Sequence, residues 1–209
     1  MSTFAELRSK VSRRLLDPNN TAVSTADVDA SINDAIRYWK FTEFNFNRAY
    51  ATQTLTLQNN VITLPSDFLV PSVYDSGFRI EYSEQRYPLT KLHEQDYDAL
   101  WRGNGYGRPN AYAKVGSNYL VYPIPDRAYS IICSYLKDYP NLVNDSDTND
   151  FTINAPRLIT LWATANLISE FRQDEKMESY FRNAARDEVT NLERLNDKVQ
   201  GSGSLNTYF

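Results

Sequence analysis

The stretch from Pro156 to Val199 constrains the fold more than any other part of this sequence, because its apolar residues have the period of two consecutive helices. The first helix is expected from Pro156 to Phe171, and its apolar residues cover two faces. These residues are Leu158, Leu161, Trp162, Ala165 and Ile168 on one face, and Ile159, Ala163 and Leu167 on the other. A helix that is apolar on two sides packs between neighbours, so we expect it to be buried inside a helical body.

The second helix is expected from about Glu175 to Val199, after a corner at Gln173-Asp174. Its apolar stripe is narrower and consists of Met177, Phe181, Ala184, Val189, Leu192, Leu195 and Val199. The other faces carry charges of both signs, which contact either solvent or a neighbouring copy of the chain. Large aromatic side chains dominate core energetics, so the expected core anchors are Trp39, Trp162 and Phe181.

The N-terminal residues predict a helix from Thr3 to Leu16, which Asp17-Pro18 ends because a residue before proline avoids the helical region. Its apolar face consists of Phe4, Leu7, Val11 and Leu15, and its opposite side is basic, with Arg8, Lys10, Arg13 and Arg14. Two interpretations of the basic side remain open. It faces solvent, or it contacts an acidic partner surface or a nucleic acid.

A further helix is expected to follow, with Thr25 as its N-cap and an end between Phe41 and Phe46. Its apolar face consists of Val28, Ile32, Ala35, Ile36 and Trp39. Since the two N-terminal and the two C-terminal helices all have apolar stripes, we expect them to pack together as one four-helix body.

Between these helix pairs the apolar residues alternate, which predicts strands. Thr52 to Leu57 alternates, and Asn59-Asn60 is expected to form a hairpin turn before a second strand at Val61 to Leu64. Further strands are expected at 78–82, 86–89, 111–115, 119–122 and 129–136, and one short helix at 92–101. The predicted fold class is α+β, with an antiparallel β-sandwich or barrel-like subdomain inserted into the four-helix body.

The expected domain boundaries follow from this order of elements. Residues 1–46 and 138–199 form the helical body, 47–137 form the inserted β subdomain, and 200–209 form a flexible tail rich in Gly and Ser. A plain linker has no need of apolar groups, yet the tail carries Leu205, Tyr208 and Phe209. The tail is therefore either a docking peptide that orders on a partner, or a frayed terminus or an addition from cloning.

Charge and cysteine content argue against several classes of protein. The net charge of −4 and the pI near 5.1 disfavour a nucleic-acid binder that works by neutralising phosphates. Cys133 is the only cysteine, so no disulfide can form within the chain, and a buried structural thiol is expected. The sequence shows no signal-peptide core and no membrane-spanning run, so we expect a soluble protein made in the cytosol.

Three motifs resemble chemical sites, and each departs from the required pattern. The acidic run Asp145 to Asp150 begins like a calcium loop, but the sixth position is not Gly and the twelfth is Pro156 rather than Glu. The glycines between Gly103 and Gly107 are not followed by a helix, as a phosphate-binding loop would require. The one histidine, His93, cannot form a multi-histidine metal site. We therefore predict no catalytic, cofactor-binding or metal-binding residues and no enzymatic activity.

The order of short motifs along the chain nevertheless resembles a known family. The motifs are Ile62 to Phe68, Gly107-Arg108-Pro109, Tyr112, Tyr119 to Pro125, Tyr129 to Tyr135, Asp147 to Phe151, and Ala155-Pro156 before the last helix pair. In this order and spacing the chain resembles the head-to-tail adaptor (connector) proteins of tailed bacteriophages, over most of residues 3–199. Similar strings also occur in the tail tubular proteins of short-tailed phages.

The resemblance implies a virion structural protein at the neck/tail junction, made in the host cytoplasm. It implies a homo-oligomeric ring of about twelve copies, closed by contacts between two different faces of the chain. The charged flank of the last helix and the aromatic-rich β insertion are the expected faces. The implied partners are the portal protein, which the tail with Leu205, Tyr208 and Phe209 would contact, and downstream tail or nozzle proteins. DNA would pass through the ring without sequence-specific binding, and no membrane is involved.

Two alternatives remain open. The chain is similar enough to tail tubular or tail-completion ring proteins that the sequence does not separate them from an adaptor. A tail-associated binding module or glycan hydrolase is less favoured, because no pair of carboxylates stands out among the acidic residues.

Overall fold

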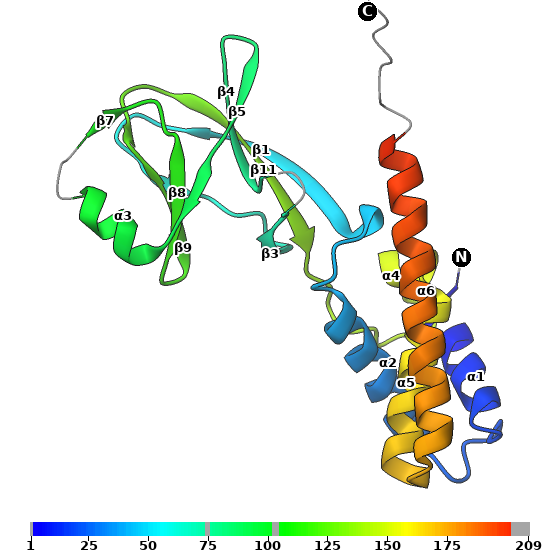
Figure 1. Cartoon of the computed structure of the whole chain (residues 1–209). Helices are drawn as coiled ribbons and strands as arrows, with labels where there is room; N and C mark the ends of the chain where they lie inside the picture. Colours follow the sequence, from blue (N-terminus) through cyan, green and yellow to red (C-terminus); the bar gives the residue numbers. More distant parts are fainter. Residues whose placement is uncertain (1, 74–75, 102–104, 202–209) are drawn as a thin grey trace, which may run out of the picture. The chain divides into compact units, whose positions relative to one another are not determined.

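The computed structural model describes residues 2–73, 76–101 and 105–201 (Figure 1). The chain divides into two compact units, which we call the helical unit (Met1–Asn47 and Tyr139–Phe209) and the β unit (Arg48–Asp138). Each unit has its own cluster of buried apolar residues. The predicted α+β class is confirmed.

The helical unit contains the helices α1 (Phe4–Arg14), α2 (Thr25–Trp39), α4 (Asp150–Asn154), α5 (Pro156–Leu167) and α6 (Glu175–Gly201). α5 packs against the other four, and its residues from Leu158 to Ala165 are all buried. The prediction from its two apolar faces is therefore confirmed. The two buried threonines of this helix do not leave unsatisfied hydroxyls, because Thr160 donates to Pro156 O and Thr164 donates to Thr160 O.

Two details of the predicted helices are wrong. Ser24, and not Thr25, is the N-cap of α2, since the Ser24 hydroxyl accepts a hydrogen bond from the Asp27 amide at 3.2 Å. The regular α-helix that begins at Pro156 ends at Leu167 and continues as a π-helical segment, Ile168–Arg172. Gln173 then closes the segment in the left-handed conformation, with φ of 52°. Apolar spacing does not distinguish α from π geometry over one turn.

The β unit contains one sheet in the order β1-β11-β4-β5, with β3 paired to β11 beyond the end of β4. These strands are β1 (Arg48–Leu55), β3 (Phe68–Pro71), β4 (Phe78–Tyr82), β5 (Gln85–Pro88) and β11 (Tyr129–Lys137). All of the pairings in this sheet are antiparallel. The sheet therefore joins strands that lie far apart in the sequence.

A second sheet has the order β2-β9-β8-β6, and the short helix α3 (Glu94–Trp101) follows its last strand. Its strands are β2 (Val61–Ile62), β6 (Thr90–Leu92), β8 (Ala111–Val115) and β9 (Asn118–Tyr122). A two-stranded ladder joins β7 (Tyr106–Gly107) to β10 (Ile124–Pro125). Contrary to the all-antiparallel prediction, β6 pairs parallel with β8, and β7 pairs parallel with β10.

The predicted hairpin at Asn59-Asn60 is also wrong. β1 pairs with β11 and β2 pairs with β9, so this turn carries the chain from one sheet to the other. The Asn59 amide does close a turn by donating to Thr56 O, but the Gln58 amide donates to Pro125 O instead of supporting a hairpin. Leu55 and Ile62, on either side of the turn, are both buried in the core of the β unit, and this burial outweighs local pairing.

Cys133 lies in β11 and is 1% exposed, as the sequence predicted. Burial raises the pKa of its thiol to about 12, so the thiol remains protonated and unreactive at neutral pH. Its neighbours in the core include Phe78, Ile131 and Tyr135. Cys133 is therefore a packing residue of the β unit.

Candidate interaction surfaces

The candidate chemical motifs, namely the acidic run, the glycine-rich loop and His93, do not come together as a reactive centre in the described part of the chain. No group of three or more His, Cys, Asp or Glu side chains there is arranged to hold a metal ion. His93 is exposed just before α3, and its carbonyl accepts a hydrogen bond from the Tyr97 amide. Gly103 lies outside the described residues, and Gly107 belongs to β7.

In the acidic run that resembled a calcium loop, Asp147 forms hydrogen bonds with nearby backbone amides. Asp147 accepts hydrogen bonds from the amides of Val143 and Asn144, both at 2.8 Å. These bonds hold the pKa of Asp147 below its usual range. Asn149 then caps α4, where its side chain accepts from the Thr152 amide at 3.0 Å. The run is a turn followed by a helix N-terminus.

The basic side of α1 was expected to face either solvent or a partner. Part of it instead contacts other elements of the helical unit. The Arg8 guanidinium donates to Asp29 at 2.6 and 2.9 Å and to Asp145 at 2.8 Å. These hydrogen bonds raise the pKa of Arg8 above its ordinary value. Arg14 donates to the Thr160 hydroxyl of α5. Two of the four basic residues therefore join α1 to other elements.

An aromatic cluster lies on the helical unit, where α2, α5 and α6 contribute Tyr38, Trp39, Trp162 and Arg182. Tyr38 stacks on Trp162, with ring centroids 4.5 Å apart, and remains 57% exposed. The Trp39 ring meets Trp162 edge-on at 5.0 Å. The Arg182 guanidinium lies 4.8 Å from the Trp162 ring centroid. We call these four residues the aromatic cluster.

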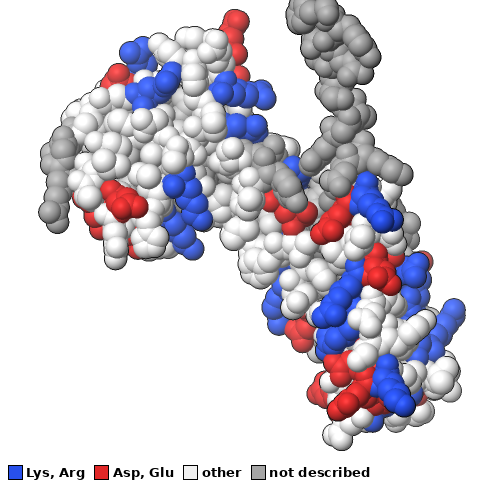
Figure 2. Space-filling model, viewed as in Figure 1, with Lys and Arg blue, Asp and Glu red and all other residues white. Residues whose placement is uncertain are grey.

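Ion pairing keeps this cluster in place and leaves charges of both signs around it. Glu178 accepts from the Arg182 Nε at 2.6 Å, and Arg157 pairs with Glu188 at 3.5 Å between α5 and α6. Figure 2 shows Lys and Arg interspersed with Asp and Glu over the helices of this unit. Aromatic and arginine side chains are enriched in protein interfaces, so the aromatic cluster is a candidate contact point.

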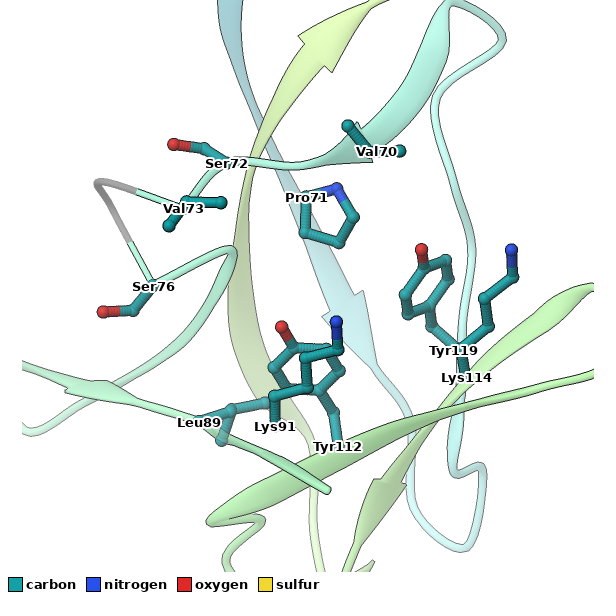
Figure 3. A pocket seen from close by; sticks show the side chains of 10 residues that line it. All are labelled: Val70, Pro71, Ser72, Val73, Ser76, Leu89, Lys91, Tyr112, Lys114 and Tyr119. Atoms are coloured by element: carbon teal, nitrogen blue, oxygen red, sulfur yellow. The ribbon is translucent and has the colours of Figure 1, made fainter. Parts of the chain in front are cut away.

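The β unit contains a cavity of about 700 Å³ between its two sheets (Figure 3). One wall is formed by β3 and the residues after it, and the other by β6, β8 and β9. Its lining residues are Val70, Pro71, Ser72, Val73, Ser76, Leu89, Lys91, Tyr112, Lys114 and Tyr119. Two lysines and two tyrosines thus meet apolar groups in one recess.

The predicted site residues fall into two groups. Trp39, Trp162 and Phe181 lie in the buried cluster of the helical unit. Leu205, Tyr208 and Phe209 lie outside the described residues, and helix α6 extends into the predicted tail as far as Gly201. In the described part of the chain, no helix is both long enough and apolar enough to cross a bilayer.

Sequence reasoning missed the cavity. Its tyrosines and lysines come from three strands, and their proximity depends on the parallel pairing of β6 with β8, which was not predicted. The sequence does show that Tyr112 and Lys114 share one face of a strand, but it does not show which strands lie beside that strand.

Each unit thus carries a surface feature suited to contacts, the aromatic cluster on the helical unit and the cavity in the β unit. The chain matches the family model described as SU10 adaptor protein over residues 2–207, and it belongs to that family. The predicted resemblance to phage adaptors is thereby confirmed, and the protein is a bacteriophage adaptor and a virion component. A comparison with curated proteins gives no match.

Proposed function

We propose that this adaptor forms a homo-oligomeric ring of about twelve copies at the neck of the virion, between the portal and the downstream tail or nozzle proteins. DNA passes through the ring during ejection without sequence-specific binding, and the protein has no enzymatic role. The observation that carries the proposal is the family match over nearly the whole chain.

A closed ring needs two different faces that fit each other on adjacent copies. The aromatic cluster and the charged flank of α6 supply one face, and the aromatic-rich β unit supplies the other. Tyr38 supports this assignment, because an exposed tyrosine stacked on a buried tryptophan is preorganised for contact at low entropic cost. The net charge of −4 fits a channel in which DNA slides, since tight phosphate contacts would retard it.

The direct test is electron microscopy of the purified protein mixed with its portal. We expect a ring seated on the portal with the channel open along its axis. A ring that assembles only on a tail component would favour the tail tubular or tail-completion alternative. Hydrolysis of host glycans by the purified protein would favour the hydrolase instead.

The C-terminal tail is proposed to dock on the portal through its apolar side chains. The triple variant Leu205→Ser, Tyr208→Ser, Phe209→Ser should lose portal binding in a pull-down while keeping the melting temperature of the wild type. The matched control is Asn206→Ser with Thr207→Ser, which alters the same tail without removing apolar groups. Equal portal binding by the two variants would exclude this role of the tail.

A further inference from the structure

The lysines and tyrosines of the cavity form one contiguous group on a single face of the second sheet. Lys91 on β6 is the register partner of Tyr112 on β8, and Lys114 on β8 is the register partner of Tyr119 on β9. Tyr112 and Lys114 are two residues apart on one strand, so they share a face. The four side chains therefore occupy neighbouring positions, and all four line the same cavity (Figure 3).

The side-chain donors of this group are not engaged by other parts of the described chain. Within the described ranges, neither lysine has an ion pair and neither phenol has a hydrogen bond. Tyr112 and Tyr119 are only 4% and 5% exposed, yet both line the open cavity. Burial raises the pKa of Tyr112 to about 12, so its hydroxyl stays protonated at neutral pH. Two ammonium groups and two hydroxyls thus face one space, in an arrangement that suits an anion.

The opposite wall of the cavity is apolar at Val70 and Pro71 and carries the hydroxyls of Ser72 and Ser76, whereas Leu89 lies beside Lys91 (Figure 3). Gly77 fits between Pro71 and Tyr112 only because it has no side chain, since a Cβ at this position would lie 2.8 Å from Pro71 Cβ and 3.3 Å from the Tyr112 hydroxyl. The recess therefore offers an apolar surface opposite cationic and hydroxyl groups, and its volume accommodates more than one side chain.

We propose that this cavity binds an acidic peptide segment of a neighbouring protein, with a carboxylate between Lys91 and Lys114 and an adjacent apolar side chain against Val70 and Pro71. The proposal goes beyond the ring and the portal contact, and it stands if either of those fails. A carboxylate satisfies the ammonium and phenol donors together, which a neutral segment would leave unpaired.

The shape of the site favours a peptide over a nucleic acid. DNA phosphates are bound by rows of basic residues on open surfaces, and affinity rises with the number of phosphates neutralised. This site has two lysines and is partly recessed, and an apolar wall contributes nothing to a phosphate backbone. An acidic side chain next to an apolar one uses both walls of the cavity.

The test is a nuclear magnetic resonance titration of the full-length protein, labelled with nitrogen-15, with two short peptides. The probe is acetyl-Gly-Phe-Asp-Gly-amide, and its matched control carries Asn in place of Asp. We expect saturable shifts of the Tyr112, Lys114 and Tyr119 amides with the Asp peptide. The Asn peptide should bind roughly tenfold more weakly, because it lacks the charge-assisted hydrogen bonds.

Variants of the protein locate the binding to this cavity. Lys91→Gln and Lys114→Gln should each weaken binding of the Asp peptide roughly tenfold, and the double variant should abolish it. Lys91→Arg, which keeps the charge, should bind nearly as well as the wild type and guards against a folding defect. Lys176→Gln removes an exposed lysine from the helical unit and should have no effect.

Several outcomes would overturn the proposal. Equal binding of the Asp and Asn peptides would show that charge is not recognised. Displacement of the Asp peptide by inorganic phosphate or duplex DNA at comparable concentration would assign the site to phosphate groups. Asp75 lies between the lining residues Val73 and Ser76 in the sequence and outside the described ranges, so Asp75→Asn is a necessary variant. Binding of the Asp peptide by that variant and not by the wild type would overturn the proposal, because the chain would then supply its own carboxylate.

Discussion

The helical unit and the β unit differ in how they use charged side chains. In the helical unit, Arg8 joins α1 to Asp29 and Asp145, and the buried Asp17 accepts four hydrogen bonds from the residues that follow it. In the β unit, Lys91 and Lys114 line a cavity and have no acceptor among the described residues. Arg8 and Asp17 thus stabilise the fold of the helical unit, whereas Lys91 and Lys114 are the residues proposed to bind a partner.

The largest expected effect comes from removing the Trp162 side chain from the core of the helical unit. Trp162→Ala removes the ring that contacts Tyr38, Trp39 and Arg182, and should destabilise the helical unit by roughly 3–5 kcal/mol. Hydrogen exchange should show faster opening of α5, with β11 unchanged, because the two buried clusters are separate. Trp162→Phe is the control and should destabilise the helical unit less, because it keeps an aromatic ring at this position. Equal acceleration in β11 would contradict the separation of the two cores.

A smaller effect is expected at Asp17, and it depends on pH. The amides of Thr21, Ala22 and Val23 donate to this carboxylate at 2.8–3.0 Å, and they hold its pKa well below the ordinary value. Because the folded pKa is lowered, this stabilisation is complete above the unfolded pKa near 4 and is lost as pH falls toward the folded value.

Asp17→Asn should therefore lower the melting temperature at pH 7, and the difference from the wild type should shrink as the pH falls below about 4. Thermal unfolding followed by circular dichroism at several pH values measures this. Asp34→Asn is the control, because Asp34 is exposed and its ion pair among the described residues is with Arg37 on its own helix. A difference that stays constant down to low pH would show that the charge of Asp17 is not involved.

The smallest effect is expected in the β unit, at the turn between β4 and β5. Ser83 and Glu84 have φ of 50° and 61°, a conformation in which glycine is favoured. The turn between β8 and β9 has Gly116 at φ of 60° instead. Glu84→Gly should therefore stabilise the β unit by about 1 kcal/mol, as measured by urea denaturation. Glu84→Ala should give no gain, and a loss with Gly would show that the Glu84 side chain stabilises the turn.

The helical unit was largely predictable from the sequence because helices are local. The apolar spacing of Leu158, Trp162 and Ala165 correctly placed α5 between other elements. The short helix α4 was missed, because its five residues are too few for a periodic pattern. The partners of Arg8 were missed as well, since Asp145 lies far away in the sequence and only the fold brings it close.

The β unit was less predictable, because its pairing is nonlocal. The strands at Phe78–Tyr82 and Ala111–Val115 were found from alternation alone, but alternation does not name a partner strand. The local turn signal at Asn59-Asn60 therefore gave a false hairpin. The cavity required both the sheet order and the parallel register of Lys91 with Tyr112, and neither can be read from one strand at a time.

The register of β1 with β11 has a consequence for how such adaptors can diversify. Arg48 is the first residue of the β unit, and it lies opposite Leu136, near the last. The chain therefore enters and leaves this unit through the adjacent ends of two paired strands. A β unit of another size or origin that ends in the same strand pair could be grafted at this point without lengthening either connection to the helices.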